Sequence, residues 1–219
     1  MLLIEASLTR PVYAKMAEPA TMRIVNFVST ANLMSWLHMP LIAEGTGGKY
    51  GPKVFPAVII RSINPRATIM LMPSGSLVVS GAISPDDAVR AMWLVTWILR
   101  RLFPVMLRGV SLQNFNVENI VATAYVGYEL NIKLFYADHM SQSIYQPKKI
   151  KPVRYYPFLP DKRKPVIVMY DTGNIIITGC VTQAESYATF KLVEWHKYRK
   201  DFEYRKFDSK PLIQKMVVG

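Results

Sequence analysis

The chain reads Asn26-Phe-Val-Ser-Thr-Ala31 in its first half and Asn119-Ile-Val-Ala-Thr-Ala124 in its second half. Two further pairs of stretches follow in the same order, namely Tyr50-Gly-Pro-Lys53 with Tyr145-Gln-Pro-Lys148, and Ser74–Gly81 with Thr172–Gly179. The offsets between copies are 93, 95 and 98 residues (119−26, 145−50 and 172−74). A unit that is used twice predicts two similar halves that pack about a pseudo-twofold axis.

The chain is strongly basic, and its two halves share the charge evenly. Lysine and arginine number 27 and aspartate and glutamate 15, which gives a formal net charge of +12. Residues 1–110 hold 11 basic and 5 acidic groups and residues 111–219 hold 16 and 10, so each half carries +6 (11−5 and 16−10). A polyanion held across both halves is the favoured partner, and duplex DNA is itself nearly twofold. A basic surface that only maintains solubility is the alternative.

The composition argues against several other classes of protein. The one cysteine, Cys180, allows no intramolecular disulfide, and no cluster of cysteine and histidine has the spacing of a zinc site, so no metal or cofactor is expected. His38, His139 and His196 stand in unrelated contexts without a nucleophile motif, which argues against an enzyme. The longest apolar segment, Ala88–Leu99, is too short to span a bilayer.

The two halves show the same order of predicted elements. The predicted strands are rich in β-branched residues and end at Gly, Pro or Asn turns; they are 24–31, 55–63, 67–72 and 77–81, then 118–126, 151–156, 166–170 and 175–179. A short or bent helix is expected at Leu33–Ala43, which contains Pro40, and another at Leu130–Met140.

A long helix is predicted to close each half. Ser84 is expected to cap the first, which runs to about Arg101. The capping-box pattern Thr182-Gln-Ala-Glu185 opens the second, which is expected to run to about Arg199. The chain is therefore predicted to be an α+β protein with an N-terminal extension (1–22), two repeats (23–110 and 111–202) and a C-terminal tail (203–219).

These stretches resemble the core of the TATA-binding protein family over about residues 23–202. The matching segments of the first half are Val25–Thr30, Tyr50–Arg61, Asn64-Pro-Arg66 and Pro73–Ala82, and those of the second half are Glu118–Thr123 and Thr172–Gly179. The resemblance implies a saddle in which two pseudo-symmetric repeats form one curved antiparallel sheet with helices on the convex face. It also implies a non-enzymatic promoter-recognition factor that acts as a monomeric pseudo-dimer, binding and bending A/T-rich DNA through the minor groove.

The resemblance assigns eight residues to the floor of the minor groove: Asn26, Val28, Val78, Ser80, Asn119, Val121, Ile176 and Thr178. The chemistry fits, because A·T pairs present only acceptors in the minor groove and an asparagine amide donates to them. A polar residue at a strand edge is the alternative for the two asparagines. Asparagine is depleted in strands, so its occurrence at both equivalent places favours the functional interpretation.

Four residues match the family positions that wedge between base steps: Phe55, Met72, Ile150 and Tyr170. Only one of them is a phenylalanine, which predicts a weaker or differently placed kink than a typical family member makes. A place in the core is the alternative for Met72 and Ile150.

Basic residues predicted to contact phosphates are Arg61, Arg66, Lys149, Lys151 and Arg154, with Lys162-Arg-Lys164 as a further basic run. A solvated loop is the alternative for the residues of the second half. The stretch Tyr145–Lys149, which includes Lys148, is basic where the family is acidic and contacts transcription factor IIB, so an altered contact with that partner is expected.

The helix at 88–102 is apolar nearly all round, and Trp93 and Trp97 are predicted to bind a partner within the polymerase machinery. A deeper core beneath the N-terminal extension is the alternative. A second hypothesis for the whole chain is a protein-interaction module that keeps the saddle and has weakened or lost DNA binding. A binder of RNA or single strands is disfavoured, because the sheet face is mostly valine and isoleucine. The expected location is the nucleus, or a viral factory or virion if the source is viral.

Overall fold

The computed structural model describes residues 22–159 and 164–201, and their strands form one antiparallel sheet. The first repeat contributes five strands: β1 (Arg23–Asn32), β2 (Lys49–Gly51), β3 (Phe55–Ile63), β4 (Arg66–Leu71) and β5 (Ser76–Ala82). The second repeat contributes their five counterparts: β6 (Gln113–Tyr125), β7 (Ser143–Gln146), β8 (Ile150–Tyr155), β9 (Val166–Met169) and β10 (Asn174–Cys180).

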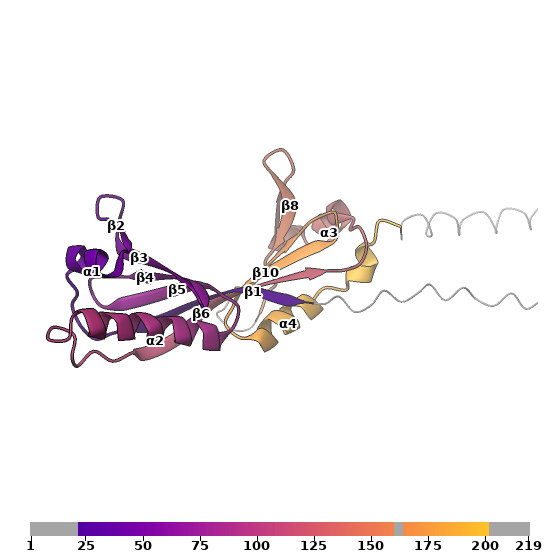
Figure 1. Cartoon of the computed structure of the whole chain (residues 1–219). Helices are drawn as coiled ribbons and strands as arrows, with labels where there is room; N and C mark the ends of the chain where they lie inside the picture. The colour runs from indigo at the N-terminus through magenta and orange to yellow at the C-terminus, as the bar shows by residue number, and fades with distance from the viewer. Residues whose placement is uncertain (1–21, 160–163, 202–219) are drawn as a thin grey trace, which may run out of the picture.

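The strand order is symmetric about its centre and reads β2-β3-β4-β5-β1-β6-β10-β9-β8-β7. On each side of the central pair β1 and β6, the equivalent strands of the two repeats follow in the same order, from β5 and β10 at the inside to β2 and β7 at the edges. The sheet is curved, and the hairpins β2–β3 and β7–β8 rise at its opposite ends (Figure 1). The predicted saddle of two pseudo-symmetric repeats is therefore confirmed.

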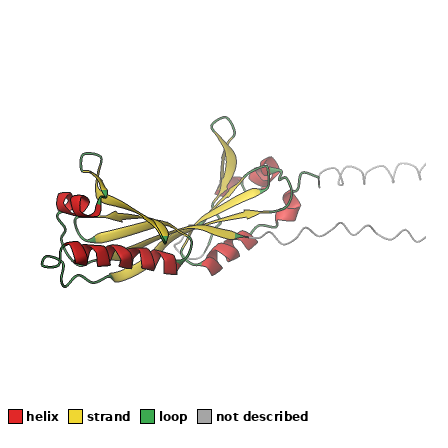
Figure 2. Cartoon of the chain, in the orientation of Figure 1, coloured by secondary structure: helices red, strands yellow, loops and turns green. Residues whose placement is uncertain are grey.

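The helices lie against one side of this sheet. They are α1 (Met39–Thr46), α2 (Pro85–Leu102), α3 (Ile132–Asp138) and α4 (Gln183–Lys191), with 3-10 turns η1 (Met140–Gln142) and η2 (Trp195–Tyr198). The helices α2 and α4 run beneath the convex face, while α1 and α3 lie near the two ends (Figure 2). No helix among the described residues is long and apolar enough to cross a membrane.

Alternation along the strands builds the core between sheet and helices. On β1 the buried residues are Phe27, Ser29 and Ala31, while their neighbours Asn26 and Val28 are only half-buried. Successive side chains of a strand point to opposite faces, so the half-buried set faces away from the helices. Each repeat has its own hydrophobic cluster, and Ile24 packs against both clusters.

The helix α2 forms as predicted. The Ser84 hydroxyl accepts a hydrogen bond from the Asp87 backbone N–H at 3.1 Å, and Pro85 stands in the first turn. The inward side of the helix is small or aliphatic and fully buried, as at Ala88, Ala91 and Leu99. Arg100 and Arg101 occupy the last turn, where positive charge is favoured by the helix dipole.

The first short helix differs from the prediction of Leu33–Ala43. It begins only at Met39, because Pro40 lacks a backbone N–H and is tolerated in a first turn but not inside a helix. The His38 ring accepts from the Leu41 backbone N–H at 3.4 Å, and Gly47 ends the helix in the left-handed conformation, with φ of 66°.

The closing helix of the second repeat is shorter than predicted. It ends at Lys191 rather than near Arg199, and residues 195–198 form the separate turn η2. The Trp195 indole N–H donates to the Phe190 carbonyl at 3.0 Å, and the two rings stack. The edge strands β2 and β7 were not predicted at all, because three or four residues are too few to show an alternating pattern.

Candidate nucleic-acid interface

The concave face is the side of the sheet that the helices do not cover. All eight residues predicted for the groove floor belong to it, since each is half-buried and stands between buried neighbours or beside them. Val78 of β5 pairs with Thr30 of β1, and Ile176 of β10 pairs with Thr123 of β6. The outer members of the set therefore lie beside the two central strands, which carry the asparagines. The fold therefore brings together the two copies of the predicted set on a single surface.

The centre of the concave face carries a reciprocal pair of contacts. Asn26 pairs with Val121, and Val28 pairs with Asn119. The repeat offset of 93 residues converts each pair into the other (26+93=119 and 28+93=121), so the pseudo-twofold axis passes between them. An asparagine and a valine from each repeat thus stand at the middle of the surface.

The asparagine side chains are oriented by the sheet itself. The Asn26 side-chain oxygen accepts from the Gly81 backbone N–H at 2.6 Å, and the Asn119 oxygen accepts from the Gly179 N–H at 2.7 Å. The Thr178 hydroxyl also donates to the Asn119 oxygen, at 3.1 Å. Because a backbone N–H fixes the oxygen, the amide N–H groups of both asparagines remain as donors without a partner among the described residues.

Two glycines make this orientation possible. Gly81 and Gly179 have φ of 87° and 88°, in the left-handed region that disfavours other residues, and the register of their strands shifts beside them. Such a bulge turns a backbone N–H out of the ladder and toward the asparagine. The sequence signal for this feature is the repeated dipeptide Ser80-Gly81 and Thr178-Gly179, and the bulges themselves were not predicted.

The predicted wedge residues lie at the two ends of the saddle. Phe55 and Ile150 open β3 and β8 beside the hairpin turns, and they are 39% and 36% exposed. Met72 and Tyr170 directly follow β4 and β9 and are half-buried. Exposure of Ile150 disfavours the alternative that it belongs to the core. Val54, at the tip of the first hairpin and 92% exposed, was not predicted.

The predicted phosphate contacts are exposed and lie in the outer strands of the two repeats. These strands are here called the first arm (β2–β4) and the second arm (β7–β9). Arg61 is in β3 and Arg66 opens β4, while Lys149, Lys151 and Arg154 belong to the β7–β8 hairpin. None of the five forms an ion pair within the described part of the chain. Lys148 is exposed in the same hairpin turn, and of the basic run at 162–164 only Lys164 lies within the described residues.

A ring cluster supports the second arm from behind. Phe135 packs edge-on against both Tyr155 and Tyr198, and the Tyr198 hydroxyl lies 3.0 Å from the His139 Nε2 atom. Burial raises the pKa of Tyr155. Burial is also the larger cause of the raised pKa of Tyr198, and the nearby Asp138 carboxylate raises that pKa further. Tyr155 ends β8, so this cluster holds the strand that presents Arg154.

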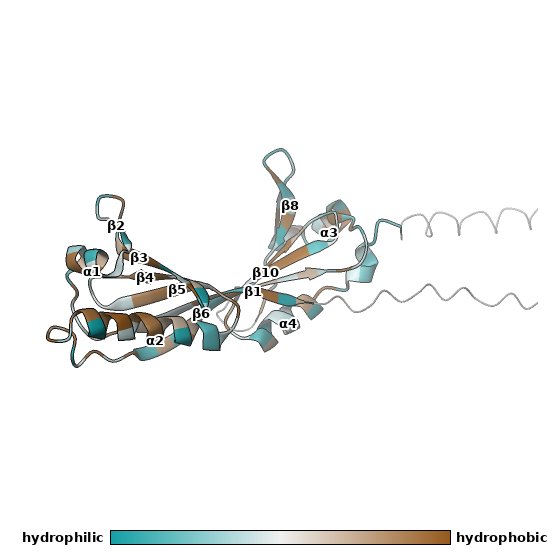
Figure 3. Cartoon of the chain, in the orientation of Figure 1, coloured by the Kyte–Doolittle hydropathy of each residue, from teal (hydrophilic) through white to brown (hydrophobic). Residues whose placement is uncertain are grey.

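The convex side has a second exposed surface, on α2. Trp93 and Trp97 are 48% and 62% exposed, and Val89 and Arg101 continue the same four-residue spacing; these four residues are here called the α2 stripe. Brown segments alternate with teal and pale ones along this helix (Figure 3). The predicted alternative, a cover formed by the N-terminal extension, concerns residues 1–21 and lies outside the described residues.

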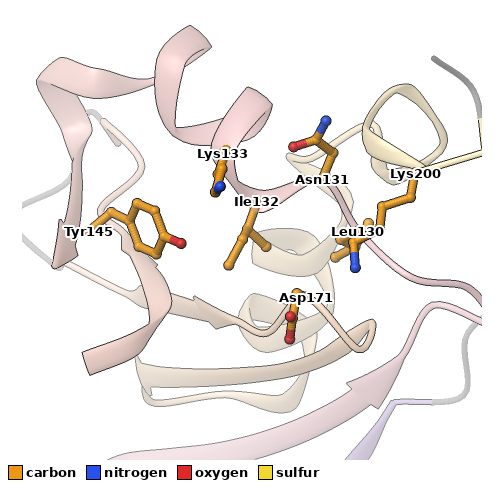
Figure 4. Close-up of a pocket in the computed structure, with 7 residues that line it drawn as sticks. All are labelled: Leu130, Asn131, Ile132, Lys133, Tyr145, Asp171 and Lys200. Carbon is orange, nitrogen blue, oxygen red and sulfur yellow. The ribbon is translucent and has the colours of Figure 1, made fainter. Parts of the chain in front are cut away.

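One pocket of about 500 Å³ lies beside α3 (Figure 4). Seven residues line it: Leu130, Asn131, Ile132, Lys133, Tyr145, Asp171 and Lys200. None of them belongs to the predicted groove floor. The Lys200 Nζ atom donates to the Glu129 carboxylate at 2.8 Å, which occupies one of the two pocket amines. No group of three His, Cys, Asp or Glu residues within the described ranges is arranged to hold a metal ion.

Known proteins share both the sequence pattern and the fold. The family described as "Transcription factor TFIID (or TATA-binding protein, TBP)" matches residues 21–102 and 114–194, once per repeat. The TATA-box-binding protein of Tetrahymena thermophila is 30% identical over 185 residues, which cover 82% of this chain and 72% of that protein. The TATA-box-binding protein of Dictyostelium discoideum is 31% identical over 168 residues, which cover 76% and 78%.

The structure of Methanococcus jannaschii TBP has the same fold. It superposes with a TM-score of 0.65 over 78% of this chain and 94% of that chain, at 24% identity. A duplicated, curved antiparallel sheet with helices on its convex side defines a class of saddle proteins. Within that class, this chain belongs to the TATA-binding protein family, which is a family of transcription factors rather than of enzymes.

Proposed function

We propose that the chain is a promoter-recognition factor that binds A·T-rich duplex DNA through the minor groove and so nucleates transcription initiation. One observation carries the proposal: the two central asparagines have their oxygens engaged by Gly81 and Gly179 and their amide N–H groups free. A·T pairs offer only acceptors in the minor groove, so a surface with donors at its centre is complementary to them.

The surroundings of the asparagines suit the same partner. The centre of the surface is apolar, as contact with base edges requires, because it carries Val28, Val121, Val78 and Ile176. The wedge residues at both ends fit a bent duplex, since insertion of apolar side chains between base steps is how members of this family kink DNA. Met72 and Ile150 stack less well than phenylalanine, so a weaker or differently placed kink belongs to the proposal.

The sharpest test replaces both asparagines by aspartate. Asn26→Asp with Asn119→Asp keeps an oxygen for each glycine N–H but removes the donors and adds negative charge. Affinity for an A·T-rich duplex should fall by at least about 100-fold, since a good base contact is worth about 1–3 kcal/mol and two are lost. Fluorescence anisotropy with a labelled duplex measures this change.

Asn131→Asp is the matched control. The Asn131 side-chain oxygen also accepts from a backbone N–H, that of Leu134 at 3.1 Å, but it caps α3 away from the concave face. This variant makes the same chemical change and should bind DNA almost as the unaltered chain does. Equal affinity of the double variant and the unaltered chain would refute the proposal.

A second candidate function is a protein-interaction module of the transcription machinery with weakened DNA binding. The exposed α2 stripe favours it, because large aromatic residues are enriched at the centres of protein interfaces. The Tyr187 ring of α4, by contrast, is covered by Lys191 at 4.5 Å. A partner with acidic and apolar residues suits Trp93, Trp97 and Arg101. At the stretch that includes Lys148, a partner resembling transcription factor IIB would contact basic rather than acidic residues.

The aspartate variant separates the two candidates in a second readout. If it binds no duplex and also fails to support transcription from an A·T-rich promoter in a factor-depleted nuclear extract, DNA recognition is the function. If it still supports transcription, the chain acts through its protein contacts. A nuclear location follows from either candidate in a eukaryotic source.

A further inference from the structure

The two halves of the concave face differ in charge at equivalent positions. One cross-strand row of the second half runs, by pairing, through Arg154, Val168, Ile176, Thr123 and Arg23. The equivalent row of the first half runs through Ile59, Met70, Val78, Thr30 and Asn116. Arginine thus stands at both ends of the row in the second half, while the first half has isoleucine and asparagine there.

Glu118 increases this difference. It is the only acidic residue in the ten described strands, and it is exposed. The register between β1 and β6 steps from Val28–Asn119 to Ser29–Val117, so Glu118 is the extra residue of a bulge. Its repeat equivalent is Val25 (118−93=25), which has no charge.

The Glu118 side chain is held on the concave face. The Thr30 hydroxyl donates to the Glu118 Oε1 atom at 2.7 Å, and Thr30 belongs to the half-buried set of β1. No cation among the described residues pairs with this carboxylate, and its Oε2 atom has no hydrogen-bond partner there. A negative acceptor therefore points toward the partner of this surface, about two residues, or roughly 7 Å, from the pseudo-twofold axis.

A carboxylate in this place is unfavourable against most of a duplex. Phosphate oxygens and the minor-groove edges of A·T pairs are all acceptors, so they repel a carboxylate or leave it without a donor. The minor groove contains one base-edge donor, the exocyclic amine of guanine. A carboxylate accepting from that amine is a charge-assisted hydrogen bond, which is stronger than a neutral one.

We propose that Glu118 is a specificity-determining residue that accepts a hydrogen bond from a guanine amine, so that the preferred site contains one G·C pair off its centre. This inference rests on the proposed minor-groove function. Because Val25 replaces Glu118 in the other half, the guanine is preferred on one side only. The two halves of the concave face are then not interchangeable, and the chain binds its site in one orientation, with Arg23 and Arg154 over the part that is purely A·T.

The test uses duplexes in which each A·T pair is replaced in turn by G·C or by inosine·cytosine. Inosine pairs with cytosine but lacks the guanine amine, so the two replacements differ in the minor groove by that one donor. At one off-centre position the unaltered chain should bind G·C about tenfold more tightly than inosine·cytosine, as expected for one charge-assisted base contact. Glu118→Val, which introduces the residue of the equivalent position, should abolish or reverse this preference.

Two further variants check the cause. Thr30→Val removes the hydroxyl that orients Glu118 and should weaken the preference without abolishing A·T binding. Glu44→Val makes the same charge change on α1 and should leave the preference intact. The proposal is overturned if the unaltered chain binds A·T duplexes but nowhere favours G·C over inosine·cytosine, or if Glu118→Val keeps the preference. Binding to no duplex at all would overturn the proposed function, and this inference with it.

Discussion

Ser29 and Ala122 occupy equivalent positions on the two central strands (29+93=122), and both are fully buried. The Ser29 hydroxyl has no hydrogen-bond partner among the described residues. A buried hydroxyl without a partner costs about 1–3 kcal/mol. We therefore expect Ser29→Ala to leave the free energy of unfolding unchanged or raise it by about 1 kcal/mol, measured by denaturant unfolding.

Val79→Ala is the control for Ser29→Ala, because Val79 pairs with Ser29 and is equally buried. It removes buried methyl groups and should lower the free energy of unfolding by about 2 kcal/mol. A comparable loss in Ser29→Ala would show that the hydroxyl has a partner after all.

Single residues also show how far the sequence predicts the site. The eight groove residues fell on one face because strand periodicity and the repeat fix that face together. The hydrogen bonds from Gly81 and Gly179 to the asparagines were not predicted, because they depend on bulges that alter the local register. Glu118 was not recognised either, since its bulge breaks the alternation by which a face is assigned.

At the scale of elements, the turn before β10 positions a predicted wedge. Gly173 has φ of 87°, and a Cβ atom there would collide with the Tyr128 carbonyl oxygen. Its N–H donates to the Tyr170 carbonyl at 3.0 Å. Gly173→Ala should therefore lower the free energy of unfolding by more than about 3 kcal/mol, from left-handed strain together with the backbone clash. Thermal unfolding followed by circular dichroism measures it.

Gly47→Ala separates the two causes. Gly47 also has a positive φ, of 66°, but a Cβ atom there meets nothing within 4 Å. Only the conformational strain remains, so the loss should be about 1 kcal/mol. Equal losses in the two variants would mean that the Tyr128 carbonyl moves aside without cost.

The elements that the sequence predicts are those with strong local signals. α2 has a capping serine, an early proline and a basic last turn, and its bounds are close to those expected. The end of α4 has no glycine or proline to mark it; the helix stops where the Trp195 indole N–H reaches the Phe190 carbonyl. That contact depends on side-chain packing, which periodicity does not encode.

For the whole molecule, the pseudo-twofold repeat is what made the fold predictable, because three repeated motifs in one order constrain the topology of both halves. The repeat does not extend to charge. The basic groups of the first arm are spread over Lys49, Lys53 and Arg61 of the β2–β3 hairpin and Arg66 of β4, whereas those of the second gather in the β7–β8 hairpin. Symmetry of the backbone therefore coexists with two chemically different arms.

The net charge of +12 and the exposed cations of both arms predict a steep dependence of DNA affinity on salt. Each neutralised phosphate contributes about 0.9 to the slope of log K against log salt concentration. Arg66→Ala, on the first arm, and Lys149→Ala, on the second, should each reduce that slope by about one and weaken binding to all duplexes alike. Arg101→Ala removes a cation that is also exposed, from α2 on the convex side, and should leave the slope unchanged. If only the Arg66 variant changed the slope, Lys149 would make no phosphate contact, and the basic β7–β8 hairpin would be left for contact with a protein.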